Sequence, residues 1–297
     1  MSLFNLCRKV SNFYAIIQAE GSVSFQMMQR KFRENLPLQG NFYPVASSAF
    51  IEDGSVRMTI LAAQPSAGTS LQSGQLELMQ DRRVRSDDGH GIGQGCTDNL
   101  VTVTKYKIIL EPLSEPTIGY TENTVPVLSL TTHHLLHSLL HPVQTFKSIY
   151  SSTTEISPGF EHQFIGYDLT SPRGLPCDIQ LVNTLSFLPI GNHVTSRASG
   201  LNSSLERKLR PEVAFIFHQQ VYDGRFDVMK VVKTCNFEEM GKLRVADLFG
   251  AALSNDLKRM SISFLHDFHE NWAVDEAVPV GPMEVRGLKA KFAPSAG

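Results

Sequence analysis

The sequence predicts an all-β protein, mainly large β-sandwich type units of antiparallel strands with one or two short helices. Two observations support this fold class. Short runs of apolar residues alternate with polar residues at the two-residue period of a strand. Glycine, proline, asparagine and aspartate separate these runs, as they do in the turns of antiparallel sheets. The pattern therefore favours sandwiches over a parallel sheet built from alternating strands and long helices.

The clearest strand pattern lies at residues 56–63. Val56, Met58 and Ile60 alternate there with polar positions such as Arg57. Successive side chains of a strand point to opposite faces. The spacing therefore predicts a strand with one better-buried face and a second face that carries the arginine.

Further strand patterns lie at residues 75–83, 101–110, 213–217 and 283–292. The apolar phase changes near Lys105 in the second of these runs and at Gly287 in the last, which predicts a bulge or bend at both places. The third run is apolar on both faces and predicts a central strand that is covered on both sides.

Two stretches depart from the strand pattern. Residues 131–140 predict a short helix because leucines cluster at helical spacing and Pro142 follows, and residues 245–253 predict a second one. Residues 151–174 and 191–204 are rich in serine, threonine, glycine and proline, which is typical of loops.

These elements predict four parts of the chain. Residues 1–40 form a lead-in, and residues 41–125 a β-sandwich segment with a glycine-rich loop. Residues 126–175 form a connection of helix and loop, and residues 176–297 a second β-sandwich segment.

Charge and composition exclude several classes of partner. The 27 basic and 29 acidic residues nearly cancel, so the chain has no basic footprint for nucleic acid. No apolar run reaches the roughly 18 residues that span a bilayer, and residues 1–21 lack the pattern of a secretory signal. We therefore expect no nucleic acid, no membrane segment and no targeting signal in this chain.

The cysteines are four in number and widely scattered: Cys7, Cys96, Cys177 and Cys235. No CxxC pair occurs, so a zinc knuckle and a dense disulfide framework are excluded, while one or two disulfides stay possible. The triplet that begins at Asn202 is a glycosylation sequon and is compatible with a secretory route.

The stretch DRRVRSDDGHGIGQGCTDN, residues 81–99, is the main candidate for function. Its glycines allow backbone conformations that bring the chain close to a ligand, and loops on a β scaffold often carry function. One interpretation is a sugar-facing loop. The other is a connection in which Asp87 and Asp88 cap turns through their own backbone. From the residues alone both remain open, and the second is favoured.

Asp87 and Asp88 do not suit the carboxyl pair of a glycosidase. Adjacent residues of an extended chain point to opposite faces, whereas the two carboxyls of a retaining enzyme face one sugar about 5–5.5 Å apart. The sequence therefore predicts no catalytic residue here.

A histidine cluster is the best metal candidate. His133, His137 and His141 are four residues apart, and His134 lies beside the first. Histidines at i and i+4 of a helix can chelate a divalent ion. The HExxH signature fails because His134 stands at the position of the glutamate base. The ligand set is incomplete, so we predict no metal site in this chain.

Several motifs together resemble one enzyme family. LPLQGNFYPVASSAFIEDGSVRMTILAAQ (residues 36–64), the run from Ser70 to Asn99, LPCDIQLVN (residues 175–183) and PMEVRGLKAKF (residues 282–292) occur in the order and spacing of glycoside hydrolase family 38 α-mannosidases. The segment GQGCTDN, from Gly93, is similar to the Golgi branch of that family. The resemblance covers the chain from about Ser24 to Phe292.

The resemblance implies an activity whose catalytic residues lie upstream of this chain. Family members are retaining, zinc-dependent enzymes that hydrolyse α-linked mannose, with the zinc ligands and both carboxyls in an amino-terminal barrel. We therefore expect a mannose-containing N-glycan as partner, a lumenal Golgi location, zinc only in the full-length enzyme, and no activity of this chain alone. The alternative is a free-standing carbohydrate-binding or structural β-sandwich protein.

The resemblance also assigns a substrate-binding role to the loop. In the family this loop reads as two aspartates, then Asn or Gly, then Arg-Gly, and the arginine reaches into the active-site pocket. The matching residues here are Asp87, Asp88, His90 and Gly91, with His90 in place of the arginine. Histidine is shorter and lacks the forked guanidinium donor, so we expect weaker contact with the sugar.

Overall fold

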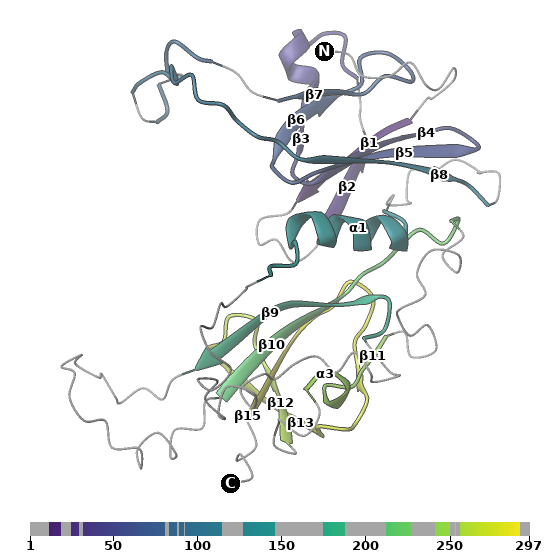
Figure 1. Ribbon diagram of the computed structural model, residues 1–297, viewed down its shortest axis with the longest axis vertical. Helices are drawn as coiled ribbons and strands as arrows, with labels where there is room; N and C mark the ends of the chain where they lie inside the picture. The colour runs from purple at the N-terminus through teal and green to yellow at the C-terminus, as the bar shows by residue number, and fades with distance from the viewer. Residues whose placement is uncertain are drawn as a thin grey trace, which may run out of the picture. The chain divides into compact units, whose positions relative to one another are not determined.

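Each of two units of the chain is built around a five-stranded antiparallel sheet (Figure 1). Unit 1 comprises residues 1–144 and 222–232, and unit 2 comprises residues 145–221 and 233–297. The computed structural model describes residues 12–18, 25–29, 32–80, 83–87, 89–91, 93–114, 127–145, 175–187, 212–226, 241–249, 253 and 256–291. This architecture confirms the all-β prediction.

The large sheet of unit 1 has the strand order β2-β1-β4-β5-β8. Its strands are β1 (Asn12–Gln18), β2 (Phe25–Gln29), β4 (Ser48–Glu52), β5 (Val56–Ala62) and β8 (Tyr106–Pro112). A small sheet of order β3-β6-β7 is formed by β3 (Tyr43–Val45), β6 (Ser66–Thr69) and β7 (Glu77–Met79), and the 3-10 helix η1 (Leu38–Asn41) precedes it. The strand predicted at residues 75–83 is confirmed in its middle part, as β7.

Both faces of β5 are buried, although the sequence predicted one better-buried face. Met58 and Ile60 pack into one apolar cluster, and Leu61 packs into another with Leu136 of helix α1 (Leu130–Leu140). Arg57, on the face expected to be less buried, is fully buried as well. The prediction was wrong because side chains distant in sequence cover this second face.

Helix α1 is fixed at its first turn by side chains. The Ser129 hydroxyl accepts a hydrogen bond from the Thr132 backbone N–H at 3.1 Å, which is the usual way to cap a helix. The buried Glu111 of β8 accepts hydrogen bonds from the hydroxyls of Ser129 and Thr132. Pro142 follows the helix end. The predicted short helix is therefore confirmed, and β8 holds its amino terminus.

Unit 2 has a sheet of order β13-β12-β15-β10-β9. The strands are β9 (Ile179–Phe187), β10 (Glu212–Gln219), β12 (Asp256–Met260), β13 (Asp267–Ala273) and β15 (Val285–Lys291). The short strands β11 (Lys242–Leu243) and β14 (Val278–Pro279) pair with each other, and helix α3 covers Ala246–Phe249. Helix α3 lies within the predicted second helix, residues 245–253.

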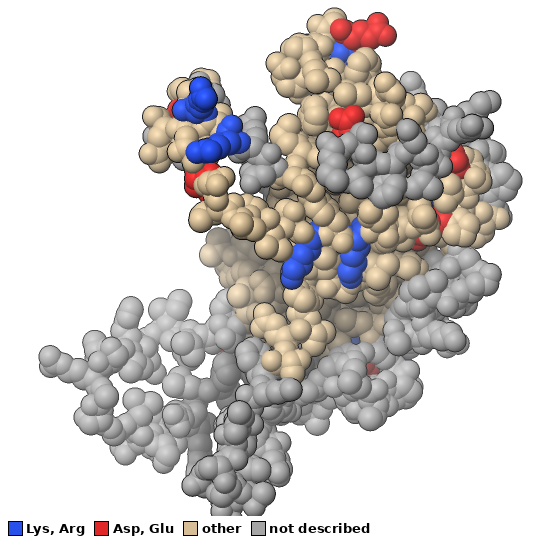
Figure 2. Space-filling model, turned by 45° about the horizontal axis from the view of Figure 1, so that its top comes forward, with Lys and Arg blue, Asp and Glu red and all other residues tan. Residues whose placement is uncertain are grey.

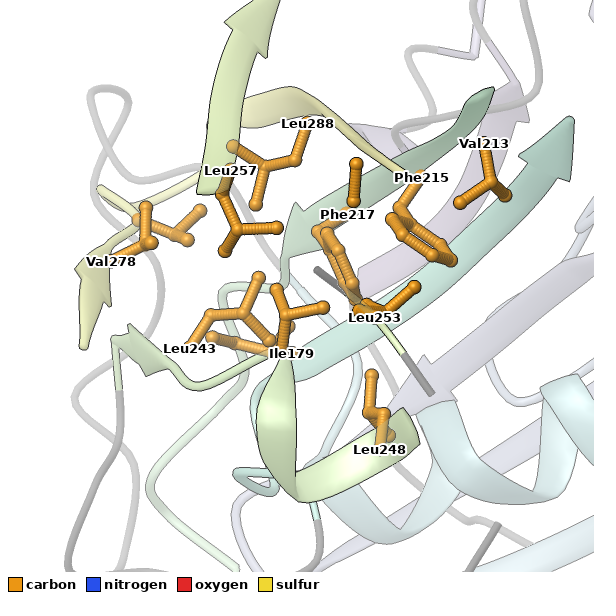
Figure 3. Close-up of a cluster of buried hydrophobic side chains, with 13 residues drawn as sticks. Ile179, Val213, Phe215, Phe217, Leu243, Leu248, Leu253, Leu257, Val278 and Leu288 are labelled. Atoms are coloured by element: carbon orange, nitrogen blue, oxygen red, sulfur yellow. The ribbon is translucent and has the colours of Figure 1, made fainter. Parts of the chain in front are cut away.

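The core of unit 2 lies on one face of this sheet. Figure 3 shows Phe215 and Phe217 of β10 among side chains from other strands and Leu248 of α3. Their neighbours Ala214 and Ile216, on the opposite face of β10, are buried too. This confirms the prediction of a central strand covered on both sides.

Two predicted bulges are absent from the described strands in which they were expected. Strand β8 begins at Tyr106, and the residues from 101 to 105 are outside any described strand, so the change of apolar phase marks the strand start. Gly287 sits within a continuous β15, where a Cβ atom would lie 2.7 Å from the carbonyl oxygen of Met260. The absence of a side chain at Gly287 therefore lets β12 approach β15 closely. The loops predicted at 151–174 and 191–204, the latter with Asn202, lie outside the described residues.

Candidate functional site: the glycine loop of unit 1

The loop between β7 and β8 is closed at its base by one backbone and one side-chain hydrogen bond. Residues 83–97 are called the glycine loop below. The Val84 N–H donates to the Cys96 carbonyl oxygen at 3.1 Å, and Arg83 Nη2 donates to the Thr97 carbonyl oxygen at 2.7 Å. A Cβ atom on Gly95 would lie 2.5 Å from the Val84 carbonyl oxygen. Glycine is thus required at this position for the two sides to meet. Figure 1 shows the loop as an arm that leaves the strands of unit 1.

The tip of the glycine loop is shaped by Asp87. Its Oδ2 atom accepts hydrogen bonds from the backbone N–H groups of Gly89, at 3.1 Å, and Gly93, at 3.2 Å. Both glycines have positive φ, of 85° and 73°, a conformation that other residues rarely adopt. The Asp87 carboxylate therefore caps a turn of the loop's own backbone, which is one of the two interpretations given by the sequence.

The residues predicted to bind substrate lie at this tip. His90 and Gly91 are exposed and Asp87 is partly buried. A Cβ atom on Gly91 would lie 3.8 Å from Asp87 Oδ1, so these two residues are neighbours. Asp88 lies outside the described residues. The structure thus brings three of the four predicted residues together in one turn.

The candidate metal histidines differ in their surroundings. His133 is buried, His137 is partly buried, and His134 and His141 are exposed. In the part of the chain that the structure describes, no group of three or more His, Cys, Asp or Glu residues is placed to hold a metal ion.

Charges are interspersed on the surface of the chain. On the face drawn in Figure 2, lysine, arginine and acidic side chains occur among uncharged ones, without a broad basic patch. In the described helices, no segment is long and apolar enough to cross a membrane.

Sequence reasoning missed a cluster of four charged residues in unit 1, of which three are buried and Arg225 is partly exposed. Arg57 Nε donates to Glu52 at 2.7 Å, and Arg57 Nη2 lies 2.7 Å from Asp223. Arg225 contacts the same two carboxylates, at 2.9 Å and 2.6 Å. Two positive and two negative groups therefore neutralise each other.

Aromatic rings complete the surroundings of Arg57. Its guanidinium carbon lies 3.9 Å from the ring centroid of Phe50 and 4.6 Å from that of Phe226. Such cation–π contacts strengthen when water is excluded, and this side chain has no exposed surface. The only sequence signal was an arginine within an apolar strand, and the position of its distant partner was not predictable.

Unit 2 contains a buried histidine at position 218 of the chain. His218 of β10 is almost fully buried, and neither ring nitrogen has a partner among the described residues. Burial lowers the pKa of His218 from its ordinary value of 6.5 because the charged form loses its hydration. The neutral form is therefore favoured in the folded protein.

The described cysteines are in different states. Cys177 is disulfide-bonded, whereas Cys96 in the glycine loop is free and exposed. Disulfides form and persist mainly in oxidising compartments such as the secretory pathway.

Comparison with known families finds a match for the part of unit 1 that includes the start of the glycine loop. Residues 15–90 match the model of the glycosyl hydrolases family 38 C-terminal domain. These residues are similar to a family 38 carboxy-terminal domain. The family 38 match includes most of the large sheet of unit 1 and the first half of the glycine loop, up to His90.

Relatives extend the likeness to most of the chain. Alpha-mannosidase 2 from Mus musculus is 31% identical over 90% of this chain, which corresponds to 22% of the mouse protein. Alpha-mannosidase 2 from Drosophila melanogaster is 41% identical over 41% of the chain and 11% of its own length. Lysosomal alpha-mannosidase from Cavia porcellus is 42% identical over 23% of the chain and 7% of its own length. The chain thus spans about a fifth of the length of its long-matching relatives, and the catalytic domain of family 38 is outside it.

Proposed function

We propose that this chain is the carboxy-terminal β-rich part of a Golgi-type α-mannosidase that removes α-linked mannose from N-glycans. The likeness to alpha-mannosidase 2 over nine tenths of the chain supports this proposal most directly. The nucleophile, the acid and the zinc ligands would belong to a catalytic domain outside these 297 residues. This chain would supply the two β-rich units as a scaffold, and the glycine loop as its substrate-facing part.

The glycine loop is the part that would meet the sugar. Asp87 fixes the backbone on both sides of His90 through Gly89 and Gly93, and the imidazole is left exposed. A loop that is held in shape before binding loses less entropy on contact with a ligand. We assign His90, Gly91, Asp87 and Asp88 to sugar contact, with the His90 ring as the hydrogen-bonding group at the tip.

The disulfide supports a lumenal location. Cys177 is bonded in unit 2, and structural disulfides are rare in the reducing cytosol. A Golgi lumen that holds N-glycans in transit provides both the oxidising conditions and the substrate.

A chimera tests this function. The chain replaces the matching carboxy-terminal part of mouse alpha-mannosidase 2, and hydrolysis of a chromogenic α-mannoside is measured. We expect turnover by the chimera, and neither turnover nor stoichiometric zinc for the chain alone. Turnover by the purified chain, or a folded, zinc-loaded chimera without turnover, would contradict the proposal.

The chimera also tests the loop. His90→Arg should raise kcat/KM by about 10- to 150-fold, because a charged hydrogen bond contributes about 1.5–3 kcal/mol and each 1.36 kcal/mol is about tenfold in rate. Gln94→Arg places the same charge elsewhere in the exposed loop and is the matched control. Equal effects of both variants would mean that the loop is a connection only.

The alternative is a free-standing carbohydrate-binding module. One observation favours it: the hydrogen bond that closes the glycine loop and the one from Gly89 to Asp87 that shapes its tip both lie within unit 1. Titration of the isolated chain with a mannose-containing N-glycan separates the two functions. Saturable binding that His90→Ala abolishes would favour the module, whereas no binding by the chain alone favours the enzyme part.

A further inference from the structure

Unit 1 is built from two separate stretches of the chain. Residues 222–232 belong to it, although residues 145–221, which come between, belong to unit 2. The structure describes residues 222–226 of this returning segment, and they are called the strap below. A return of this kind closes a long loop and costs conformational entropy. The contacts that the strap makes in unit 1 must therefore offset that cost.

Side chains of the strap cover a buried arginine of β5. Arg57 has no exposed surface, and its Nη2 donates to Asp223 Oδ2 at 2.7 Å. The buried ring of Phe226 has its centroid 4.6 Å from the Arg57 guanidinium carbon. The strap also brings Arg225 to within 2.9 Å of Glu52, which is itself bound to Arg57. The charges around Arg57 are therefore balanced only when the strap is in place.

Two backbone hydrogen bonds join the strap to other parts of unit 1. The Ser114 N–H donates to the Arg225 carbonyl oxygen at 2.9 Å, and the Asp223 N–H donates to the Leu128 carbonyl oxygen at 2.8 Å. Ser114 lies just after β8, and Leu128 lies just before α1. The strap thus contacts three stretches of unit 1, which are β5, the end of β8 and the approach to α1.

Release of the strap would remove the partners of buried groups. Arg57 would keep Glu52 but lose the Asp223 carboxylate and the Phe226 ring, and water would reach its guanidinium. The carbonyl oxygen of the buried Leu128 would lose the backbone donor that it now has. Buried polar and charged groups that lose a partner destabilise the folded state strongly. The closed form of unit 1 therefore depends on the docked strap.

We propose that the strap is the latch of unit 1, so that the strap and strand β5 open together in one cooperative step. Unit 1 then completes its core only after the chain has run through residues 145–221 and returned. The large apolar cluster of unit 2 contains no strap residue, so the sheet of unit 2 should stay closed when the latch opens. The inference goes beyond the proposed function and does not depend on it.

Hydrogen exchange at single amides of the full chain tests the latch without a variant. Under native conditions, the amides of Ser114, Asp223 and the middle of β5 should be protected to the same degree, within about threefold, because one opening exposes all of them. An amide of Ser114 that exchanges much faster than β5 would mean that the strap detaches from a unit 1 that stays closed. That result would overturn the proposal.

Variants of the strap give a second test. Asp223→Ala should raise exchange at Ser114 and in β5 by a similar factor of about 150 or more, which corresponds to about 3 kcal/mol at about 1.36 kcal/mol for each factor of ten. Phe226→Leu is a milder change and should raise both by about 2- to 30-fold. Amides of β10 in unit 2 should change by less than about threefold in either variant.

Gly224→Ala is the matched control within the strap. A Cβ atom added there would have no neighbouring atom within 4 Å, so all exchange rates should stay as they are. If Phe226→Leu or Asp223→Ala accelerated Ser114 but left β5 unchanged, the strap would not be a latch. Equal acceleration of β5 and β10 would show that the whole chain opens at once, and it would overturn the proposal as well.

Discussion

Arg57 and Asp223 are joined by an ion pair of 2.7 Å, although 166 residues separate them in the sequence. The pair fixes the segment around Asp223 against strand β5 of unit 1. Most of the intervening chain after residue 144 belongs to unit 2. Through this contact, residues 222–232 join the core that is formed mainly by residues 1–144 of unit 1.

Removal of Arg57 should strongly destabilise unit 1. Arg57→Ala leaves Glu52 and Asp223 buried with a single remaining cation, and breaking a buried ion pair from one side costs about 3–5 kcal/mol. The free energy of unfolding from denaturant titration, followed by a probe in unit 1, measures this loss.

A surface ion pair provides the matched control. Arg259 contacts Glu270 at 2.7 Å, with both side chains partly exposed, so Arg259→Ala should cost about 1 kcal/mol or less. Similar losses for Arg57→Ala and Arg259→Ala would contradict the role of the buried cluster.

Asp87→Ala should loosen the tip of the glycine loop without affecting the sheet. The carboxylate accepts two backbone hydrogen bonds, and each contributes about 0.5–1.5 kcal/mol to local order. The amides of Gly89 and Gly93 should therefore exchange about 2- to 12-fold faster, at about 1.36 kcal/mol for each factor of ten, as mass spectrometry of hydrogen exchange can show. His90→Ala, at the exposed tip, should leave both rates unchanged. Unchanged rates in Asp87→Ala would mean that the loop is held by other contacts.

Local sequence patterns predicted a helix or strand well where its own apolar spacing and flanking residues mark it. The helix at 131–140 and the central strand at 213–217 follow from apolar spacing and from Pro142, and both are present. The second face of β5 was not predictable in this way. Its burial depends on α1 and on the segment near Asp223, which are far from β5 in sequence.

The glycine loop shows the same limit. Its glycines and its acidic pair marked it as special, and the role of Asp87 as a turn cap was among the alternatives. The closure by Val84 and Cys96 was not foreseen, because a single pair of backbone groups leaves no periodic signal. Gly287 likewise indicated an irregular strand, whereas the structure uses it for a close approach to Met260.

His218 should make unit 2 less stable in mild acid. Its pKa is lowered in the folded state by burial, so between that value and 6.5 the unfolded chain binds a proton that the folded chain excludes. The stability that unit 2 gains by keeping His218 neutral is fully present above about pH 6.5 and is lost as the pH falls toward the folded pKa. His218→Leu removes this titration and should flatten the curve.

The test compares the unfolding free energies of the unsubstituted protein and of His218→Leu between about pH 5 and about pH 8. This range spans the ordinary titration of histidine. The difference between the two curves isolates this histidine from the carboxylates, which titrate in both proteins. A difference that stays constant across the range would show that His218 does not couple protonation to folding.

Gly95→Ala should open the base of the glycine loop. An added Cβ atom would lie 2.5 Å from the carbonyl oxygens of Val84 and Arg85, which is closer than real contacts allow, so the backbone must shift. Overpacking of this kind costs about 1–3 kcal/mol. The hydrogen bond from the Val84 N–H to the Cys96 carbonyl oxygen should weaken, and the Val84 amide should exchange about 5- to 150-fold faster. Gly54→Ala is the matched control, since a Cβ atom added there would have no neighbouring atom within 4 Å. If Val84 exchanged equally slowly in both variants, the loop would have to accommodate the methyl group without opening, and the close contact at Gly95 would not be what holds its two sides together.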